Sequence, residues 1–192
     1  MNILILNGSP GNERGATARR LKDAVAREAT ARAWNVTAFD LDSMTIKPCS
    51  GCFACWLKHP GTCAIKDDAE AVLRAHIQSD ILAWITPITF GGYSSALKKA
   101  LDRLIPSILP FFHKVHDEIH HPQRYERRRR LVVIGTLARA DNEAERIFHN
   151  LARRNAINMN SLKTESGVFY EGTGERELVA KVSALIGLVG AA

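Results

Sequence analysis

The sequence predicts a doubly wound α/β fold, in which helices cover both faces of a parallel sheet. Three continuously apolar runs carry this prediction: residues 3–6, 81–85 and 131–135. Short apolar runs without alternation are typical of strands that are buried on both faces. Each run is followed by a loop and then by apolar residues at helical spacing, which indicates repeated units of strand, loop and helix.

The first part of the chain contains two strands and two helices. The strand at 3–6 is followed by a polar loop and by a helix that begins near Thr17, with apolar side chains on one face and arginine and lysine on the other. Residues 36–39 are predicted to form an edge strand. Further on, Asp67 and Glu70 have the spacing of a capping box and predict a helix that ends near residue 77.

The remaining elements repeat this order. The strand at 81–85 is followed by a further helix, and the strand at 131–135 by a helix with an apolar face over 144–152. A strand within 158–169 and a helix over 175–188 complete the pattern of alternating strands and helices.

The loop after the first strand decides between two strand orders. Its glycines, Gly8, Gly11 and Gly15, do not have the G-x-G-x-x-G spacing of a Rossmann fold. A five-stranded sheet that starts with a glycine-containing phosphate loop most often has the strand order 2-1-3-4-5 of flavodoxin, with right-handed crossovers. We therefore predict a flavodoxin-like parallel sheet with helices on both faces, in a single domain that spans residues 1–192.

Length and composition exclude several classes of protein. With 192 residues and 46% hydrophobic side chains, one core is expected. No basic segment precedes the first apolar run, and no stretch is as long as a membrane span, so we predict neither a secretory signal nor a membrane partner. Four cysteines in such a chain favour thiol or metal chemistry over disulfides, which predicts a reducing compartment, the cytoplasm.

One segment of the chain is densely basic. The formal net charge is +6, and Arg127–Arg130 is its densest part. A nucleic-acid site is one interpretation of such a run. The run lies directly before an apolar strand and interleaves no aromatic residues, which is more typical of a solvated strand entry. We therefore predict no nucleic-acid partner.

Two loops at the carboxyl ends of the strands are the predicted ligand site, because doubly wound sheets bind ligands there. The first offers the polar groups of Ser9, Asn12 and Thr17 beside a helix N-terminus. This loop suits a phosphate, and the alternative is an ordinary turn. The second, residues 86–93, combines a proline, two glycines and two aromatic residues. It suits a flat ring such as a flavin, and the alternative is the first turn of a helix.

The segment 43–66 is a cysteine-rich loop. Its four cysteines are close enough in sequence to converge on one metal centre: Cys49, Cys52, Cys55 and Cys63. A [4Fe–4S] cluster, a zinc site and buried free thiols are the alternatives. A catalytic thiol is less favoured, because no cysteine has an adjacent histidine in a nucleophile arrangement.

The long segment 105–130 contains apolar residues and clustered histidines. Its apolar residues predict a lid over the ligand or a contact between subunits: Pro106, Leu109, Pro110, Phe111 and Phe112. The histidines are a candidate metal site, although a solvated surface is the more typical interpretation: His113, His116, His120 and His121.

A resemblance to a known family rests on four pieces of sequence: ILNGSPG, KPCSGCFACW, PGTCAIKDD and TPITFGGYSSALKKALDR. Together with the strands around them, over residues 1–135, they resemble the NADPH-dependent FMN reductase and iron–sulfur flavoprotein branch of the flavodoxin-like superfamily. The chain departs from the pattern of this branch at Gly11, Ala16 and Thr89, where relatives often have arginine, asparagine and an aromatic residue.

The resemblance implies particular site residues for the cofactor FMN. The residues implied for its phosphate are Ser9, Asn12 and Thr17. The residues implied for its ribityl chain and ring are Pro87, Ile88, Phe90, Gly91 and Gly92, with Thr136 as a further contact. No catalytic side chain is predicted, because the cofactor supplies the chemistry and the protein supplies orientation.

Three functions follow as hypotheses. The resemblance implies an FMN-dependent NAD(P)H oxidoreductase that passes electrons to a quinone, a flavin or another small acceptor. One alternative is an electron carrier with a [4Fe–4S] cluster on the four cysteines, and another is a zinc or anion-binding module without flavin. Since relatives commonly associate, a homodimer or homotetramer is expected.

Overall fold

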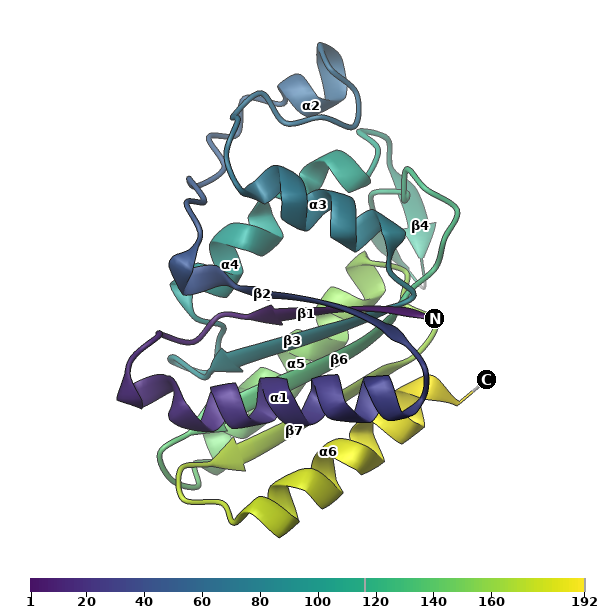
Figure 1. Ribbon diagram of the computed structural model, residues 1–192. Coiled ribbons are helices and arrows are strands. Elements are labelled where there is room, and N and C mark those ends of the chain that lie inside the picture. Colours follow the sequence, from purple (N-terminus) through teal and green to yellow (C-terminus); the bar gives the residue numbers. More distant parts are fainter. Residues whose placement is uncertain (116, 192) are drawn as a thin grey trace.

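The computed structural model describes residues 1–115 and 117–191 (Figure 1). A five-stranded parallel sheet with the order β2-β1-β3-β6-β7 forms its centre. These strands are β1 (Asn2–Asn7), β2 (Asn35–Asp40), β3 (Ile81–Pro87), β6 (Arg130–Leu137) and β7 (Thr164–Tyr170). Since β4 and β5 pair outside this sheet, the order equals the predicted 2-1-3-4-5, and the flavodoxin-like fold is confirmed.

Helices cover both faces of the sheet (Figure 1). The helices on one face are α1 (Ala16–Ala31) and α6 (Glu175–Gly190). Those on the other face are α3 (Ala69–Gln78), α4 (Ser95–Asp102) and α5 (Asn142–Asn158). Ile3 and Ile5 pack toward the first pair of helices, and Leu4 and Leu6 toward the second group. Burial on both faces is why the central strands show no polar alternation in sequence. No helix within residues 1–115 and 117–191 is long and apolar enough to cross a membrane.

The predicted helix is present, and its N-cap lies one residue further along than predicted. Helix α3 begins at Ala69, and the side chain of its N-cap residue, Asp68, makes no capping hydrogen bond. The carboxylate of Asp67 accepts the N–H of Ala69, but its main partner is the guanidinium of Arg103. A buried, paired carboxylate is fixed by its partner, because leaving either charge unpaired in the interior is costly.

The segment 105–130 folds into a short turn, η3 (Ile105–Ser107), and an antiparallel hairpin of β4 (His113–Val115) and β5 (Glu118–His120). The hairpin binds the C-terminal part of α5. Glu118 pairs with Arg154 at 2.6 Å, and Nδ1 of His120 lies 2.9 Å from Oδ1 of Asn158.

The position of the hairpin concerns the prediction that segment 105–130 forms a lid over the ligand. Helix α5 runs antiparallel to the strands, so the hairpin lies at their amino-terminal edge, away from the loops that follow β1 and β3 (Figure 1). Within this chain the hairpin does not cover those loops. Of the four histidines singled out in sequence, His116 lies outside the described residues.

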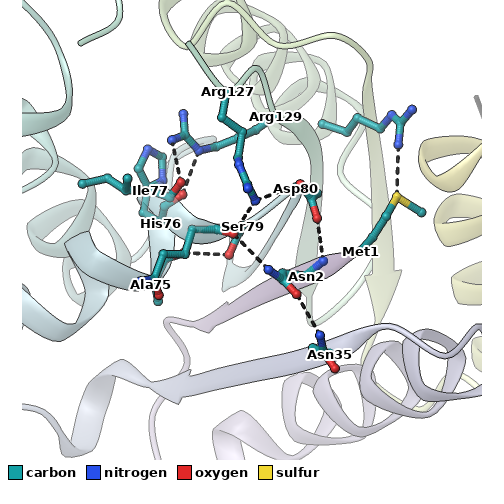
Figure 2. A network of polar contacts seen from close by, with 12 residues as sticks. Met1, Asn2, Asn35, Ala75, His76, Ile77, Ser79, Asp80, Arg127 and Arg129 are labelled. Carbon is teal, nitrogen blue, oxygen red and sulfur yellow. Dashed lines mark hydrogen bonds and ion pairs between the residues drawn. The ribbon is translucent and has the colours of Figure 1, made fainter. Parts of the chain in front are cut away.

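The basic run, residues 127–130, lies at the same amino-terminal edge of the sheet and leads into β6. Figure 2 shows Arg129 directed at the end of α3, where Nε donates to the carbonyl of His76 at 2.7 Å and Nη2 to that of Ile77 at 3.2 Å. Arg127 pairs with Asp80 at 3.0 Å. Arg129 is 2% exposed, so the expectation of a solvated run is wrong at this residue. Its guanidinium satisfies the last carbonyls of the helix and neutralises the negative end of the helix dipole.

Candidate functional site

The loop after β1 is pressed against α4. The hydroxyl of Ser94 donates to the carbonyl of Gly8 at 2.6 Å. A Cβ atom at Gly8 would lie 2.6 Å from Cβ of Leu97, and one at Gly15 would lie 2.0 Å from the carbonyl oxygen of Pro10. Both distances are shorter than non-bonded atoms tolerate, so both positions require glycine. The close packing gives the loop a fixed shape.

This loop leads through the turn η1 (Glu13–Gly15) into the N-terminus of the 16-residue helix α1. The side chain of Asn12 accepts the N–H of Arg14 at 3.1 Å, and Thr17 lies buried in the first turn of α1. Ser9 is buried, and its hydroxyl donates to the side-chain oxygen of Asn7. Of the three predicted phosphate-binding residues, Ser9 and Asn12 therefore lie in this loop and Thr17 in the first turn of the helix that follows, with the side chain of Ser9 turned inward.

One backbone N–H of this loop donates a hydrogen bond to a carboxylate. The N–H of Gly11 donates to Oδ2 of Asp42 at 3.0 Å. Asp42 belongs to η2 (Leu41–Ser43), which follows β2. The parallel pairing of β1 with β2 sets Asn7 opposite Asp40 and so brings the two loops together. Sequence reasoning missed Asp42, because no local pattern places residue 42 beside residue 11.

The contact with Asp42 serves as a test of whether the loop fits a phosphate. An N–H group that binds a carboxylate oxygen is oriented toward an anionic oxygen. The N–H groups of Arg14, Gly15 and Ala16 already have partners in the turn, which are the side chain and carbonyl of Asn12 and the carbonyl of Glu13. The features that favour an anion here are the N–H of Gly11 and the positive dipole end of α1. This arrangement fits an anionic group such as the phosphate of FMN.

The loop after β3 forms a tight turn at the same edge of the sheet. Thr89 and Gly92 exchange two backbone hydrogen bonds of 3.0 and 2.9 Å. Phe90 and Gly91 form the tip, with φ angles of 50° and 76°. The ring of Phe90 is fully exposed. A non-glycine residue in this conformation carries backbone strain, which is typical of a functional site. An exposed aromatic ring on a rigid turn fits contact with a flat ligand ring.

Three further predicted residues lie beneath this turn. The N–H of Ile88 donates to the carbonyl of Thr136 at 2.9 Å. A Cβ atom at Gly135 would lie 2.6 Å from Cδ1 of Ile88, so the side chain of Ile88 packs down onto β6. Pro87, at the end of β3, is in register with Thr136. These residues support the turn, whereas Phe90 at its tip is exposed.

The cysteines share one small cavity. Cys49, Cys52, Cys55 and Cys63 all line a space of about 20 Å³. All four are among the described residues, and across that part of the chain no three His, Cys, Asp or Glu side chains converge closely enough to hold a metal ion. The assignment of these cysteines as metal ligands stays a prediction.

The environments of two of these thiols differ. Cys52 is exposed, Cys55 is buried, and the four-residue helix α2 (Ala54–Leu57) begins between them. The N–H of Ala54, the hydroxyl of Ser50 and the charge of Lys58 lower the pKa of Cys52. Burial and the neighbouring cysteines raise the pKa of Cys55. Cys52 is therefore the more easily ionised of the two.

An ion pair fixes both ends of the cysteine loop. Arg103 donates to both carboxylate oxygens of Asp67 at 2.8 and 2.9 Å. It also donates to the carbonyl of Lys47 at 2.8 Å and to that of Ile65 at 3.1 Å, on either side of the cysteines. Burial opposes the ionisation of Asp67, but the hydrogen bonds from Arg103 and from backbone N–H groups hold its pKa below the ordinary value. No sequence pattern indicates that Arg103 and Asp67 form a pair or that this pair lies beside the ends of the cysteine loop.

The cysteine segment packs on the outer side of the helix layer. The indole N–H of Trp56 donates to the carbonyl of Ile108 at 3.0 Å, just after η3. Figure 1 places α2 beyond α3, apart from the loops that follow β1 and β3. Helix α2, which contains Cys55, therefore lies apart from the candidate cofactor loops.

Comparison with known proteins gives relatives of this chain. It is 31% identical over 113 residues to an iron–sulfur flavoprotein of Methanocaldococcus jannaschii, which covers 58% of this chain and 55% of the relative. It is 27% identical over 106 residues to an iron–sulfur flavoprotein of Archaeoglobus fulgidus, which covers 55% of this chain and 46% of the relative. The chain thus spans about half the length of these curated relatives.

The fold has a match along almost its full length. The NAD(P)H:quinone oxidoreductase of Methanothermobacter marburgensis superposes with a TM-score of 0.70 at 12% identity and covers 96% of each chain. At this identity the likeness concerns the fold. The family model of NADPH-dependent FMN reductases matches residues 1–161, which confirms the resemblance seen in the sequence motifs. The chain belongs to the NADPH-dependent FMN reductase family.

Proposed function

We propose that the protein is an FMN-dependent NAD(P)H oxidoreductase that passes electrons to a quinone or a flavin. The observation that carries this proposal is the carboxylate of Asp42 on the N–H of Gly11, at 3.0 Å, in the loop that opens α1. This loop lies at the same edge of the sheet as the exposed Phe90 turn. An anion site and an exposed aromatic ring at the carboxyl ends of β1 and β3 are the two recognition elements that a flavin mononucleotide requires.

The residues have distinct roles in this proposal. The loop at 8–15 and the first turn of α1, with Asn12 and Thr17, hold the phosphate, and Ser9 shapes the loop through Asn7. The turn at 89–92 lies along the ring, with Phe90 as the contact that excludes water. When bound, FMN supplies the transfer of hydride and electrons, and the protein supplies orientation.

The proposal also covers how subunits of the protein associate and in which compartment the protein is located. Phe90, Phe111 and Phe112 are exposed aromatic residues. Burial of an aromatic side chain of this size stabilises a protein or a complex by about 1.5–3 kcal/mol relative to leaving the side chain in water. We assign Phe111 and Phe112 to a contact between subunits of a homodimer or homotetramer. The cytoplasm is the proposed location, since four free thiols persist in a reducing compartment.

Titration of the apoprotein with FMN, followed by flavin fluorescence, tests the proposal. We expect FMN to bind at least about tenfold more tightly than riboflavin, because charge-assisted hydrogen bonds to the phosphate contribute about 1.5–3 kcal/mol. The variant Asp42→Asn is expected to bind FMN more tightly than the wild type and riboflavin equally well, since it removes a negative charge that competes with the phosphate. The variant Asp102→Asn, with its exposed carboxylate on α4, is the matched control.

Turnover completes this test. The FMN-loaded protein is expected to oxidise NADPH or NADH in the presence of benzoquinone. A protein that binds no FMN, or that binds FMN and riboflavin equally, would contradict the proposed site. FMN binding without oxidation of either nicotinamide would contradict the proposed reaction.

A further inference from the structure

A cavity of about 150 Å³ lies between the helix layer of α3, α4 and α5 and the segment 105–130. Strand β3 contributes to its wall through Trp84, and the turn η3 contributes from the other side. Most of the wall is apolar, and its aliphatic part consists of Leu101, Leu104, Ile105, Ile108 and Met159. The segment that the sequence predicts as a lid therefore forms one wall of this cavity.

Hydrogen bonds hold the outer wall of the cavity in place. The backbone N–H of Arg124 donates to the carbonyl of Ser107 at 2.9 Å, which joins the chain before β6 to η3. The side-chain amide of Gln123 donates to the carbonyl of Asn158 at 3.0 Å, at the end of α5. The wall is thus connected both within the segment and to the helix layer. The cavity is therefore largely preformed, as small-molecule sites usually are.

Two residues that line the cavity carry a buried polar atom without a partner. Nδ1 of His76 and Nε1 of Trp84 make no hydrogen bond to any residue within 1–115 and 117–191. The two residues are only 2% and 1% exposed. An unpaired polar atom in the interior is costly, so such atoms usually have a partner. The indole N–H is a donor only and therefore requires an acceptor atom.

The chemistry and the size of the cavity select an uncharged ring. Among the described residues, those that line the cavity include no lysine, arginine, aspartate or glutamate. Burial lowers the pKa of His76 to about 3, so its imidazole is neutral at pH 7 and offers no charge to a carboxylate. An apolar cavity of about 150 Å³ is sufficient to hold benzene. The volume therefore suits a ligand with a single six-membered ring.

We propose that this cavity binds small, uncharged phenols. The ring packs against the aliphatic part of the wall, and the hydroxyl oxygen accepts the indole N–H of Trp84. A hydroxyl group suits this wall because it provides the acceptor that the indole requires, whereas an unsubstituted ring leaves the N–H unpaired. The residues that line the cavity lie outside 8–17 and 86–93. The site is therefore distinct from the candidate FMN loops and does not depend on the proposed function.

The experiment titrates phenol into the full-length, isotope-labelled protein and follows the indole N–H resonances of its three tryptophans by NMR. The variant Trp84→Phe identifies the resonance of Trp84. We expect this resonance to shift downfield and to saturate, because the N–H gains an acceptor. The resonance of Trp34, which packs on the opposite face of the sheet, is expected to stay in place. Benzene is expected to bind at least about fivefold more weakly than phenol, because it cannot accept this hydrogen bond.

Two variants and one control separate the roles of the wall. Trp84→Phe is expected to bind phenol and benzene equally, because it keeps a ring and loses the N–H. Leu101→Phe enlarges a side chain of the wall and is expected to weaken phenol binding at least about fivefold, whereas Leu188→Phe, at an exposed position on α6, is expected to bind like the wild type. Circular dichroism establishes that each variant is folded. Four results would overturn the proposal: no saturable shift of the Trp84 resonance, equal binding of phenol and benzene by the wild type, unchanged affinity in Leu101→Phe, or loss of phenol binding when FMN is added.

Discussion

Removing either partner of the ion pair between Arg103 and Asp67 is expected to destabilise the protein by several kcal/mol. The side chains are 1% and 3% exposed, so the partner left behind stays charged in the interior. Breaking a buried pair in this way typically costs about 3–5 kcal/mol. Arg103→Met also leaves the carbonyls of Lys47 and Ile65 without a donor. We therefore expect about 3 kcal/mol for Asp67→Asn and up to about 5 kcal/mol for Arg103→Met.

The assay is equilibrium unfolding in urea of the wild type, both single variants and the double variant, which together form a double-mutant cycle. Because each single variant leaves a stranded partner, the double variant is expected to cost less than the sum of the two single changes by at least about 1 kcal/mol. Asp102→Asn is the control, because its pair with Lys98 is exposed and exposed pairs contribute about 0–1 kcal/mol. Single variants that each lose less than about 1 kcal/mol would refute the assigned role of the buried pair.

The pair also predicts a pH dependence. The pKa of Asp67 is lower in the folded protein than its ordinary value of 3.8. Its stabilising contribution is therefore present above that value and is lost as the pH falls through the lower folded pKa. Asp67→Asn removes this contribution, so the variant is expected to lose less stability than the wild type on acidification. An identical acid dependence in both proteins would refute the assigned ionisation.

Two further predictions concern stability. Burial, with a smaller contribution from Arg129, lowers the pKa of His76 to about 3 from 6.5. The folded protein therefore loses about 3 kcal/mol through this group between pH 7 and pH 4. Urea unfolding at both pH values should show a smaller loss in His76→Gln, and equal losses would contradict the prediction. Ser94→Ala removes the cap on Leu97 and the bond to Gly8. We expect a loss of about 1–2 kcal/mol in the same assay, and no change would contradict the role of Ser94.

The elements follow from the sequence because their signals are local. The runs at 3–6, 81–85 and 131–135 are apolar without alternation, and each lies in a strand buried on both faces. Alternating strands and helices then leave few topologies, since crossovers are right-handed. The position of the candidate ligand loops follows from topology alone, because the carboxyl ends of parallel strands meet at one edge.

Side-chain partners do not follow from the same signals. Asp67 has the spacing of a helix cap, yet it binds Arg103, which lies 36 residues away. Asp42 reaches Gly11 only because β1 and β2 pair in one register. Such contacts depend on how separate elements pack, and periodicity carries no information about that packing.

The sequence by itself determined the strand order, the loops that carry the candidate cofactor site and the family of this protein. The tertiary structure decided that Ser9 turns inward to Asn7, that Phe90 stands fully exposed on its turn, and that strands β4 and β5 pack on α5. The physical reason is range: hydrophobic periodicity records whether a residue is buried, whereas the direction of a polar side chain depends on which distant donor or acceptor the fold brings within about 3 Å.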